Sequence, residues 1–168
     1  MNTHVLDSFI LSLVTFVPLG GAILLMVFPR RERDIRAFTL AVAVLTFILS
    51  LHLPVHYVVG QPGFQFDVNA QWITHPNIHY HMGVDGVSMW LVVLTTFLLP
   101  LCVLVSWHSV HERVKEFHIL LLMLTSAIIG VFVSLDLFLF YVFWDFMLIP
   151  MYFLIGIWGY DRRVYAAV

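Results

Sequence analysis

Charged residues and cysteine are the scarcest features of this sequence. Only 11% of its 168 residues are Asp, Glu, Lys or Arg, while 61% are hydrophobic. Soluble domains average about 25% charged and about 45–50% apolar residues, so the composition argues against a water-soluble globule. The single cysteine, Cys102, excludes an internal disulfide and any metal or iron–sulfur site that needs several thiolates.

Basic side chains are few and are confined to three short stretches. All eight lysine and arginine residues lie within residues 30–36, at 113 and 115, or at 162 and 163. No basic patch carries interleaved aromatic residues, so the pattern does not favour a nucleic-acid partner. No glycine-rich phosphate loop follows a strand pattern, so no nucleotide-binding site is predicted.

Long hydrophobic runs are what the sequence has in abundance. A helix of about 20 apolar residues crosses the hydrocarbon core of a bilayer, and five runs have about this length. We therefore predict an all-α membrane protein with five transmembrane helices in a lipid bilayer. Residues 1–82 hold two of them and residues 83–168 hold three, at the predicted spans 8–28, 37–59, 83–107, 117–134 and 136–159.

The three basic stretches predict the orientation of these spans. With five spans, all three stretches fall on one side of the membrane, and the other side receives no lysine or arginine. Loops rich in lysine and arginine stay in the cytoplasm. We therefore expect the N-terminus outside, the C-terminus in the cytoplasm, and residues 60–82 as an outer loop.

The outer loop is the longest polar stretch of the chain. Phe64, Phe66 and Val68 alternate as in a short strand or hairpin arm. Trp72 and Tyr80 have the amphipathic rings that are enriched at membrane interfaces. We predict an ordered surface loop that lies on the membrane interface.

The last apolar run, residues 137–159, carries one ionisable side chain, Asp145. Placing a carboxyl group at the bilayer centre costs roughly 3 kcal/mol, so such a residue is a functional-site hypothesis by default. Pro150 lacks an N–H, frees the carbonyl of Phe146, and predicts a helix break beside the acid. Tyr141 lies one turn earlier on the same face. We predict a proton-relay role for Asp145 with Pro150 and Tyr141 beside it; the alternative is a carboxyl that packs two helices together.

Other ionisable residues have simpler interpretations. Asp136 opens the fifth span and is read first as an N-cap, with a role in proton transfer as the less favoured alternative. Asp85 likewise opens the third span. None of the nine histidines sits mid-span, so we interpret most of them as interface or loop residues, and we predict no metal or cofactor site in this chain. The histidines weighed are His52, His56, His79, His81, His108, His111 and His118.

Three quoted stretches of the sequence resemble a known family. Residues 144–159, WDFMLIPMYFLIGIWG, resemble the proton-pumping antiporter-like subunits of respiratory NADH:quinone oxidoreductase, complex I, and most of all its subunit M or chain 4. Residues 83–101, GVDGVSMWLVVLTTFLLPL, resemble the third-helix signature of that family. Residues 129–144, IGVFVSLDLFLFYVFW, resemble its run from the fourth helix into the fifth.

The resemblance implies a larger fold than these spans make. Family members have about fourteen helices, which include two inverted five-helix repeats. The chain would then be an N-terminal fragment, whose last two spans begin the proton-translocating domain. The family normally has glutamate after the tryptophan, paired with a lysine on the seventh helix. Here that position is Asp145, and the lysine is not in this sequence.

The resemblance also implies a function. We expect a membrane subunit of a proton-translocating NADH:quinone oxidoreductase in a bacterial inner membrane, or in an organellar inner membrane if the source is eukaryotic. This chain would hold no redox centre. NADH, FMN, iron–sulfur clusters and quinone are expected on other subunits. Two alternatives stay open: a subunit of a multi-subunit Na⁺/H⁺ antiporter or membrane-bound hydrogenase, and a truncated structural subunit that does not pump.

Overall fold

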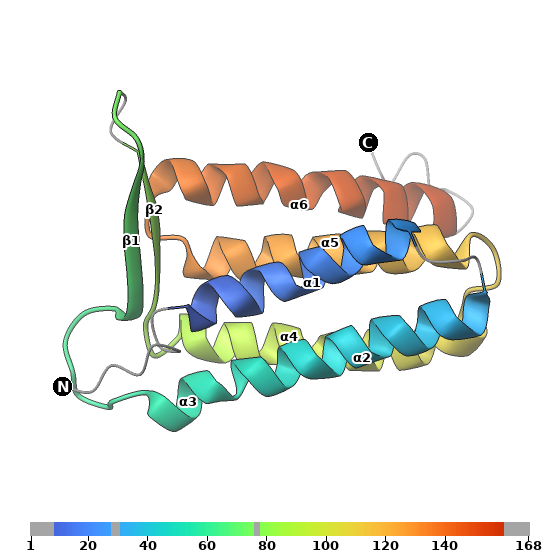
Figure 1. Ribbon diagram of the computed structural model, residues 1–168, viewed down its shortest axis with the longest axis horizontal. Coiled ribbons are helices and arrows are strands. Elements are labelled where there is room, and N and C mark those ends of the chain that lie inside the picture. The colour runs from blue at the N-terminus through green and yellow to red at the C-terminus, as the bar shows by residue number, and fades with distance from the viewer. Residues whose placement is uncertain (1–8, 28–30, 76–77, 160–168) are drawn as a thin grey trace.

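The computed structural model describes residues 9–27, 31–75 and 78–159. Its long helices run side by side, and a two-stranded hairpin stands across one end of them (Figure 1). In chain order the elements are α1 Ile10–Val27, α2 Glu32–Ser50, α3 His52–His56, β1 Gln65–Ile73, β2 Ile78–Val84, α4 Ser88–Ser109, α5 Val114–Val133 and α6 Leu137–Trp158.

Five helical segments are long and apolar enough to cross a membrane, as the sequence predicts. The segment over α2 and α3 counts as one of them. Helices α1, α2, α4 and α5 pack against one another, and α6 packs on the outside of this group against α5 (Figure 1). The helix that carries Asp145 is therefore at the edge of the bundle.

The hairpin departs from the all-α fold class, but it agrees with the strand or hairpin arm expected around Phe66 and Val68. Its antiparallel strands β1 and β2 fall within the predicted outer loop. The register shifts between Gln65 and Val68, where Phe66 has a φ of 57°. This irregularity, of the kind produced by a β-bulge, interrupts the alternation expected from Phe64 onward. On β2, Met82 is fully buried and the carbonyl of His81 accepts a hydrogen bond from Leu135 N at 2.9 Å.

The largest errors among the predicted helix boundaries are the starts of the second and third spans. The second span begins at Glu32 rather than 37, because acidic residues in the first turn suit the positive end of the helix dipole. Its continuity breaks at Leu51; Pro54 lacks the N–H that would bond the carbonyl of Ser50. The third span begins at Ser88 rather than 83, since residues 83 and 84 end strand β2.

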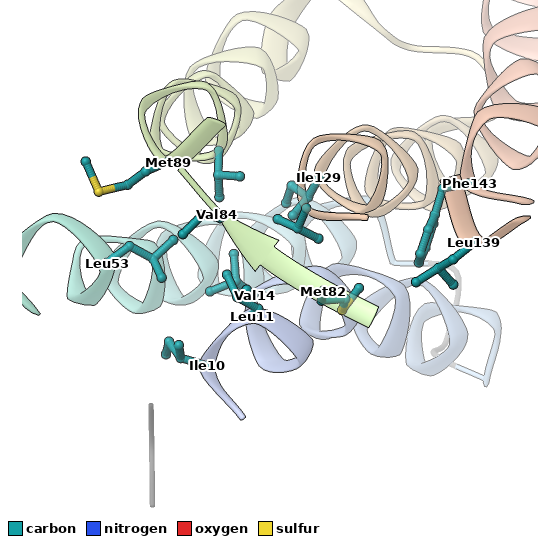
Figure 2. Packing of buried hydrophobic residues seen from close by; sticks show 12 residues of the cluster. Ile10, Leu11, Val14, Leu53, Met82, Val84, Met89, Ile129, Leu139 and Phe143 are labelled. Carbon is teal, nitrogen blue, oxygen red and sulfur yellow. The ribbon is translucent and has the colours of Figure 1, made fainter. Parts of the chain in front are cut away.

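The buried apolar residues form two clusters along the bundle. The first lies at the hairpin end, where α1, α3, α4, α5, α6 and β2 meet (Figure 2). In it Met82 and Val84 of β2 insert among helix residues such as Leu11 and Ile129. The second cluster fills the opposite end, between α1, α2, α4 and α5. The first cluster thus joins the hairpin to the helices, and the hairpin is part of the core.

Candidate functional site

Helix α6 buries less of itself than any other candidate span. Only 17% of the residues in its most apolar stretch are buried, compared with 44% in the corresponding stretches of α1 and α5. Its buried residues are Leu139, Phe143 and Pro150, which face the bundle. Most of the α6 surface is therefore open within the described part of the chain.

Asp145 lies on the open surface of α6. Two residues beyond the buried Phe143, it is turned by about 200° around the helix axis, and its side chain is exposed. Tyr141 and Tyr152 flank it on the open surface, with exposed fractions of 59% and 47%. No hydrogen bond or ion pair to Asp145 comes from the described residues. The structure places Tyr141 beside Asp145, as predicted, but it does not bury the carboxyl group.

Pro150 does not interrupt α6. The helix is continuous from Leu137 to Trp158, with the proline inside it and facing the bundle. The ring therefore removes one main-chain hydrogen bond, to the carbonyl of Phe146, without ending the helix. The predicted break is wrong in this sense. Pro150 and Asp145 also lie on different faces of the helix.

The N-terminal end of α6 is fixed by Asp136. Its side chain accepts hydrogen bonds from Phe138 N at 2.8 Å and Leu139 N at 3.2 Å, which is N-cap geometry. A third bond comes from His79 N of strand β2, at 3.2 Å. Burial raises the pKa of Asp136, but these N–H donors outweigh it and hold the pKa below its ordinary value. The cap interpretation of Asp136 is confirmed.

The C-terminal end of α6 is fixed by Trp158. Its indole Nε1 donates a hydrogen bond to the carbonyl of Glu112, in the turn between α4 and α5, at 3.0 Å. Its ring also meets Phe117 edge to face, with the centroids 5.2 Å apart. Asp145 is thus held between two anchored helix ends, which sets its depth along the bundle.

Asp85 is a cap as well. Its carboxylate accepts hydrogen bonds from Ser88 N at 2.6 Å and Val87 N at 3.1 Å, and its own N–H donates to Ser88 Oγ at 3.0 Å. This reciprocal pair resembles a capping box at the start of α4. The Ser88 N–H, the largest cause, holds the pKa of Asp85 below its ordinary value.

The basic residues within the described ranges gather at the end of the bundle opposite the hairpin. Arg36 donates to the carbonyl of Val110 at 2.9 Å and pairs with Glu32 at 3.2 Å, while Lys115 Nζ donates to the carbonyl of Met26 at 2.9 Å. These bonds join the end of the bundle where α1 leads into α2 to the turn between α4 and α5. Three further predicted basic positions, Arg30, Arg162 and Arg163, lie outside the described residues.

His118 is not a loop residue: its side chain, on α5, is fully buried. It belongs to a stripe of buried residues at helical spacing that includes Val114 and Leu122. That spacing was the available signal in the sequence. On the hairpin, by contrast, His81 pairs with Asp67 at 2.7 Å on the exposed surface. In the described part of the chain, no three metal-ligating side chains come together.

Tyr80, which was predicted at the membrane interface together with Trp72, is half-buried and shares a hydrogen bond of 2.8 Å with Ser12 of α1. Burial, only partly offset by this bond, raises the pKa of its phenol. Trp72 keeps an exposed fraction of 54%, as an interfacial ring would.

These features define a class of protein. Five apolar helices, a carboxyl group in the middle of a span and basic residues gathered at one end are the marks of a multi-pass helical membrane protein.

Comparison with known families places the chain within that class. The family model for the amino terminus of NADH-ubiquinone oxidoreductase chain 4 matches residues 13–131, and the chain belongs to this family. A second model, for the transmembrane region of NADH:quinone oxidoreductase and Mrp antiporters, matches residues 134–168.

Individual relatives agree with the family models. NADH-quinone oxidoreductase subunit M of Rhodobacter capsulatus is 45% identical over 163 residues, which cover 94% of this chain and 31% of the relative. NADH-ubiquinone oxidoreductase chain 4 of Arabidopsis thaliana is 40% identical over 156 residues, covering 92% and 32%. The chain therefore spans about a third of the length of these relatives.

A solved structure has the same fold. A chain of respiratory complex I from Thermus thermophilus with bound NADH matches with a TM-score of 0.76 and 28% sequence identity. The match covers 94% of this chain and 31% of that chain.

Proposed function

We propose that the chain contributes to a membrane subunit of a proton-translocating NADH:quinone oxidoreductase, and that Asp145 is one of its proton-carrying groups. The names of the relatives support the first part. One observation carries the second: a carboxyl group stands on the open surface of a membrane-spanning helix, with both ends of the helix anchored.

The open position of Asp145 argues for a partner beyond the described residues. A carboxyl group that faced lipid would cost roughly 3 kcal/mol or more, and intramembrane ionisable residues almost always pair or face a water-filled cavity. In this proposal, further helices cover the surface that holds Asp145, Tyr141 and Tyr152. A cation on those helices would favour the ionised carboxylate, and its withdrawal would favour uptake of a proton.

Electron transfer takes place elsewhere in the proposed complex. NADH, FMN, iron–sulfur clusters and quinone belong to other subunits in this proposal. For the clusters the reason is direct, because one exposed cysteine cannot hold a cluster. The contribution of this chain to proton pumping is electrostatic. Charge movements caused by the redox reaction alter the field at Asp145, and its proton moves to the next acceptor.

The orientation is part of the proposal. The described basic residues lie at one end of the bundle and the hairpin at the other. By the positive-inside rule, the basic end faces the cytoplasm of a bacterial cell, or the matrix of an organelle, and the hairpin faces outward. The N-terminus is then outside and the C-terminus inside.

A second candidate function is transport without redox chemistry. The family model over residues 134–168 covers Mrp antiporters as well as NADH:quinone oxidoreductases, and this region includes Asp145. In that case the same carboxyl group would exchange Na⁺ against H⁺.

The test is NADH-driven proton uptake into membrane vesicles that contain the full-length subunit in its complex. We expect Asp145→Asn to lower proton uptake by at least about tenfold, because a neutral amide cannot take up and release a proton. We expect Asp145→Glu to preserve uptake. NADH oxidation and the abundance of the complex are measured in parallel.

The control is Asp67→Asn on the exposed hairpin, which removes a carboxyl group outside the membrane and should leave pumping unchanged. Normal pumping by Asp145→Asn at normal abundance would show that the acid only packs helices. Uptake of Na⁺ in the absence of NADH would favour the antiporter alternative.

A further inference from the structure

Two buried polar atoms at the basic end of the bundle have no hydrogen-bond partner among the described residues. They are Nε of Arg36 on α2 and Nε2 of His118 on α5. Buried polar atoms are nearly always satisfied by protein or by ordered water, and each exception needs an explanation. No part of the proposed proton-relay function accounts for this pair.

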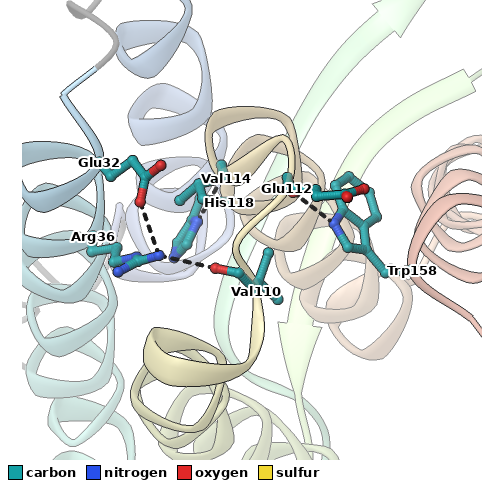
Figure 3. Close-up of polar contacts among 7 residues, drawn as sticks. All are labelled: Glu32, Arg36, Val110, Glu112, Val114, His118 and Trp158. Carbon is teal, nitrogen blue, oxygen red and sulfur yellow. Dashed lines mark hydrogen bonds and ion pairs between the residues drawn. The ribbon is translucent and has the colours of Figure 1, made fainter.

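The two atoms are chemically complementary. His118 Nδ1 lies 2.7 Å from the carbonyl of Val114, and a carbonyl can only accept, so Nδ1 carries the proton. In the neutral ring Nε2 is then an acceptor with a lone pair. Arg36 Nε–H is a donor. Figure 3 shows the Arg36 guanidinium beside the His118 imidazole.

No direct hydrogen bond joins these two atoms, and each side chain is held by bonds to other residues. The terminal nitrogen of Arg36 donates both to the carbonyl of Val110 at 2.9 Å and to Glu32 at 3.2 Å. The His118 ring is fixed by Val114 and by edge contact with Phe117, with centroids 5.4 Å apart.

We infer that Arg36 and His118 hold a single buried water molecule between them. Arg36 Nε–H donates to the water oxygen, and the water donates one hydrogen to His118 Nε2. A buried water typically needs two to four polar partners, and these two atoms supply the first two. The site binds water alone, and it is independent of the proposed proton-relay function.

The location gives this water a structural consequence. Arg36 bonds the turn 110–113 from the α2 side, and Trp158 bonds the same turn at Glu112 from the α6 side (Figure 3). The turn thus joins the helix that carries Asp145 to the centre of the bundle. The water stabilises Arg36 in the position from which it bonds this turn. His118 is a positioning residue because it holds the water.

The direct test is a high-resolution cryo-EM map of the assembled wild-type complex. We expect density for one water within hydrogen-bond distance of both Arg36 Nε and His118 Nε2. A direct contact between the two nitrogens, or a guanidinium and imidazole with no density between them, would overturn the inference.

Hydrogen–deuterium exchange tests the consequence in the same complex. His118→Phe keeps a ring of similar size but removes the acceptor that holds the water against Arg36, so the amides of the turn should exchange about tenfold faster. His118→Gln restores an acceptor oxygen and should return exchange toward the wild-type rate. Equal rates in His118→Phe and wild type would contradict the role of the water. If His118→Phe does not assemble, the wild-type map decides.

Discussion

At the scale of single residues, carboxyl groups in this chain have two different roles that depend on what surrounds them. Asp85 and Asp136 accept main-chain N–H bonds at helix starts, and these bonds stabilise their charged forms. Asp145 has no such donors among the described residues and stands on the open surface of α6. Only the third is a candidate for reversible proton transfer.

The cap at Asp136 predicts a measurable loss of stability. Asp136→Ala removes the acceptor for three N–H groups and should destabilise the full-length subunit by about 1 kcal/mol. Asp136→Asn keeps an acceptor oxygen and should recover most of this loss. Thermal unfolding of the purified subunit in detergent measures both. Equal stability of all three proteins would contradict the cap.

The same cap predicts a pH dependence confined to acid. The folded-state pKa of Asp136 lies below the ordinary value of 3.8. Its contribution is therefore fully present above that value and is lost as pH falls through the lower, folded-state pKa. The stability difference between wild type and Asp136→Ala should be constant from neutral pH to about pH 5 and should shrink in stronger acid.

At the scale of elements, α6 depends on one close contact with α5. A Cβ atom added at Gly130 would overlap the ring of Phe143, which is the buried residue closest in sequence to Asp145 on the inner face of α6. The glycine lets the aromatic ring approach the α5 backbone. A small residue on α5 therefore sets how closely the middle of α6 approaches it.

Gly130→Ala should consequently push α6 away from α5. Alanine gains up to about 1 kcal/mol of helix propensity, but overpacking of this kind costs typically about 1–3 kcal/mol, so we expect a net loss of stability and of proton pumping. Gly20→Ala in α1 is the matched control, because nothing lies within 4 Å of a Cβ there. Unchanged melting temperature and pumping in Gly130→Ala would show that Phe143 can move at no cost.

At the scale of the whole molecule, the two ends of the bundle differ in character. One end carries the hairpin, which is joined to the helices through Met82 and the bond between His81 and Leu135. The other end carries arginine and lysine side chains that donate to the main-chain carbonyls of Val110 and Met26. This asymmetry is what determines the proposed orientation.

Cysteine labelling tests that orientation. In a Cys102→Ala background, Arg33→Cys should react with a membrane-impermeant thiol reagent only from the cytoplasmic side. Gln61→Cys should react only from the outer side. Both positions are exposed, so both are accessible to the reagent. The reverse pattern in sealed vesicles of known orientation would overturn the topology.

The sequence by itself determined the number of candidate spans, the acid within the last one and the cap at Asp136. These follow from the lengths of apolar runs and from local hydrogen bonding, which depend on neighbouring residues only. The family resemblance likewise rested on contiguous motifs. Each of these features depends on residues that are close together in the sequence, so the sequence was enough to predict them without the fold.

The tertiary structure alone decided which faces are covered. Apolar runs that are hydrophobic all round do not show which side meets another helix, so the open position of Asp145 could not be assigned beforehand. The start of the third span moved because residues 83 and 84 pair in the hairpin. Cross-strand and interhelical partners are distant in sequence, and only the folded chain brings them together.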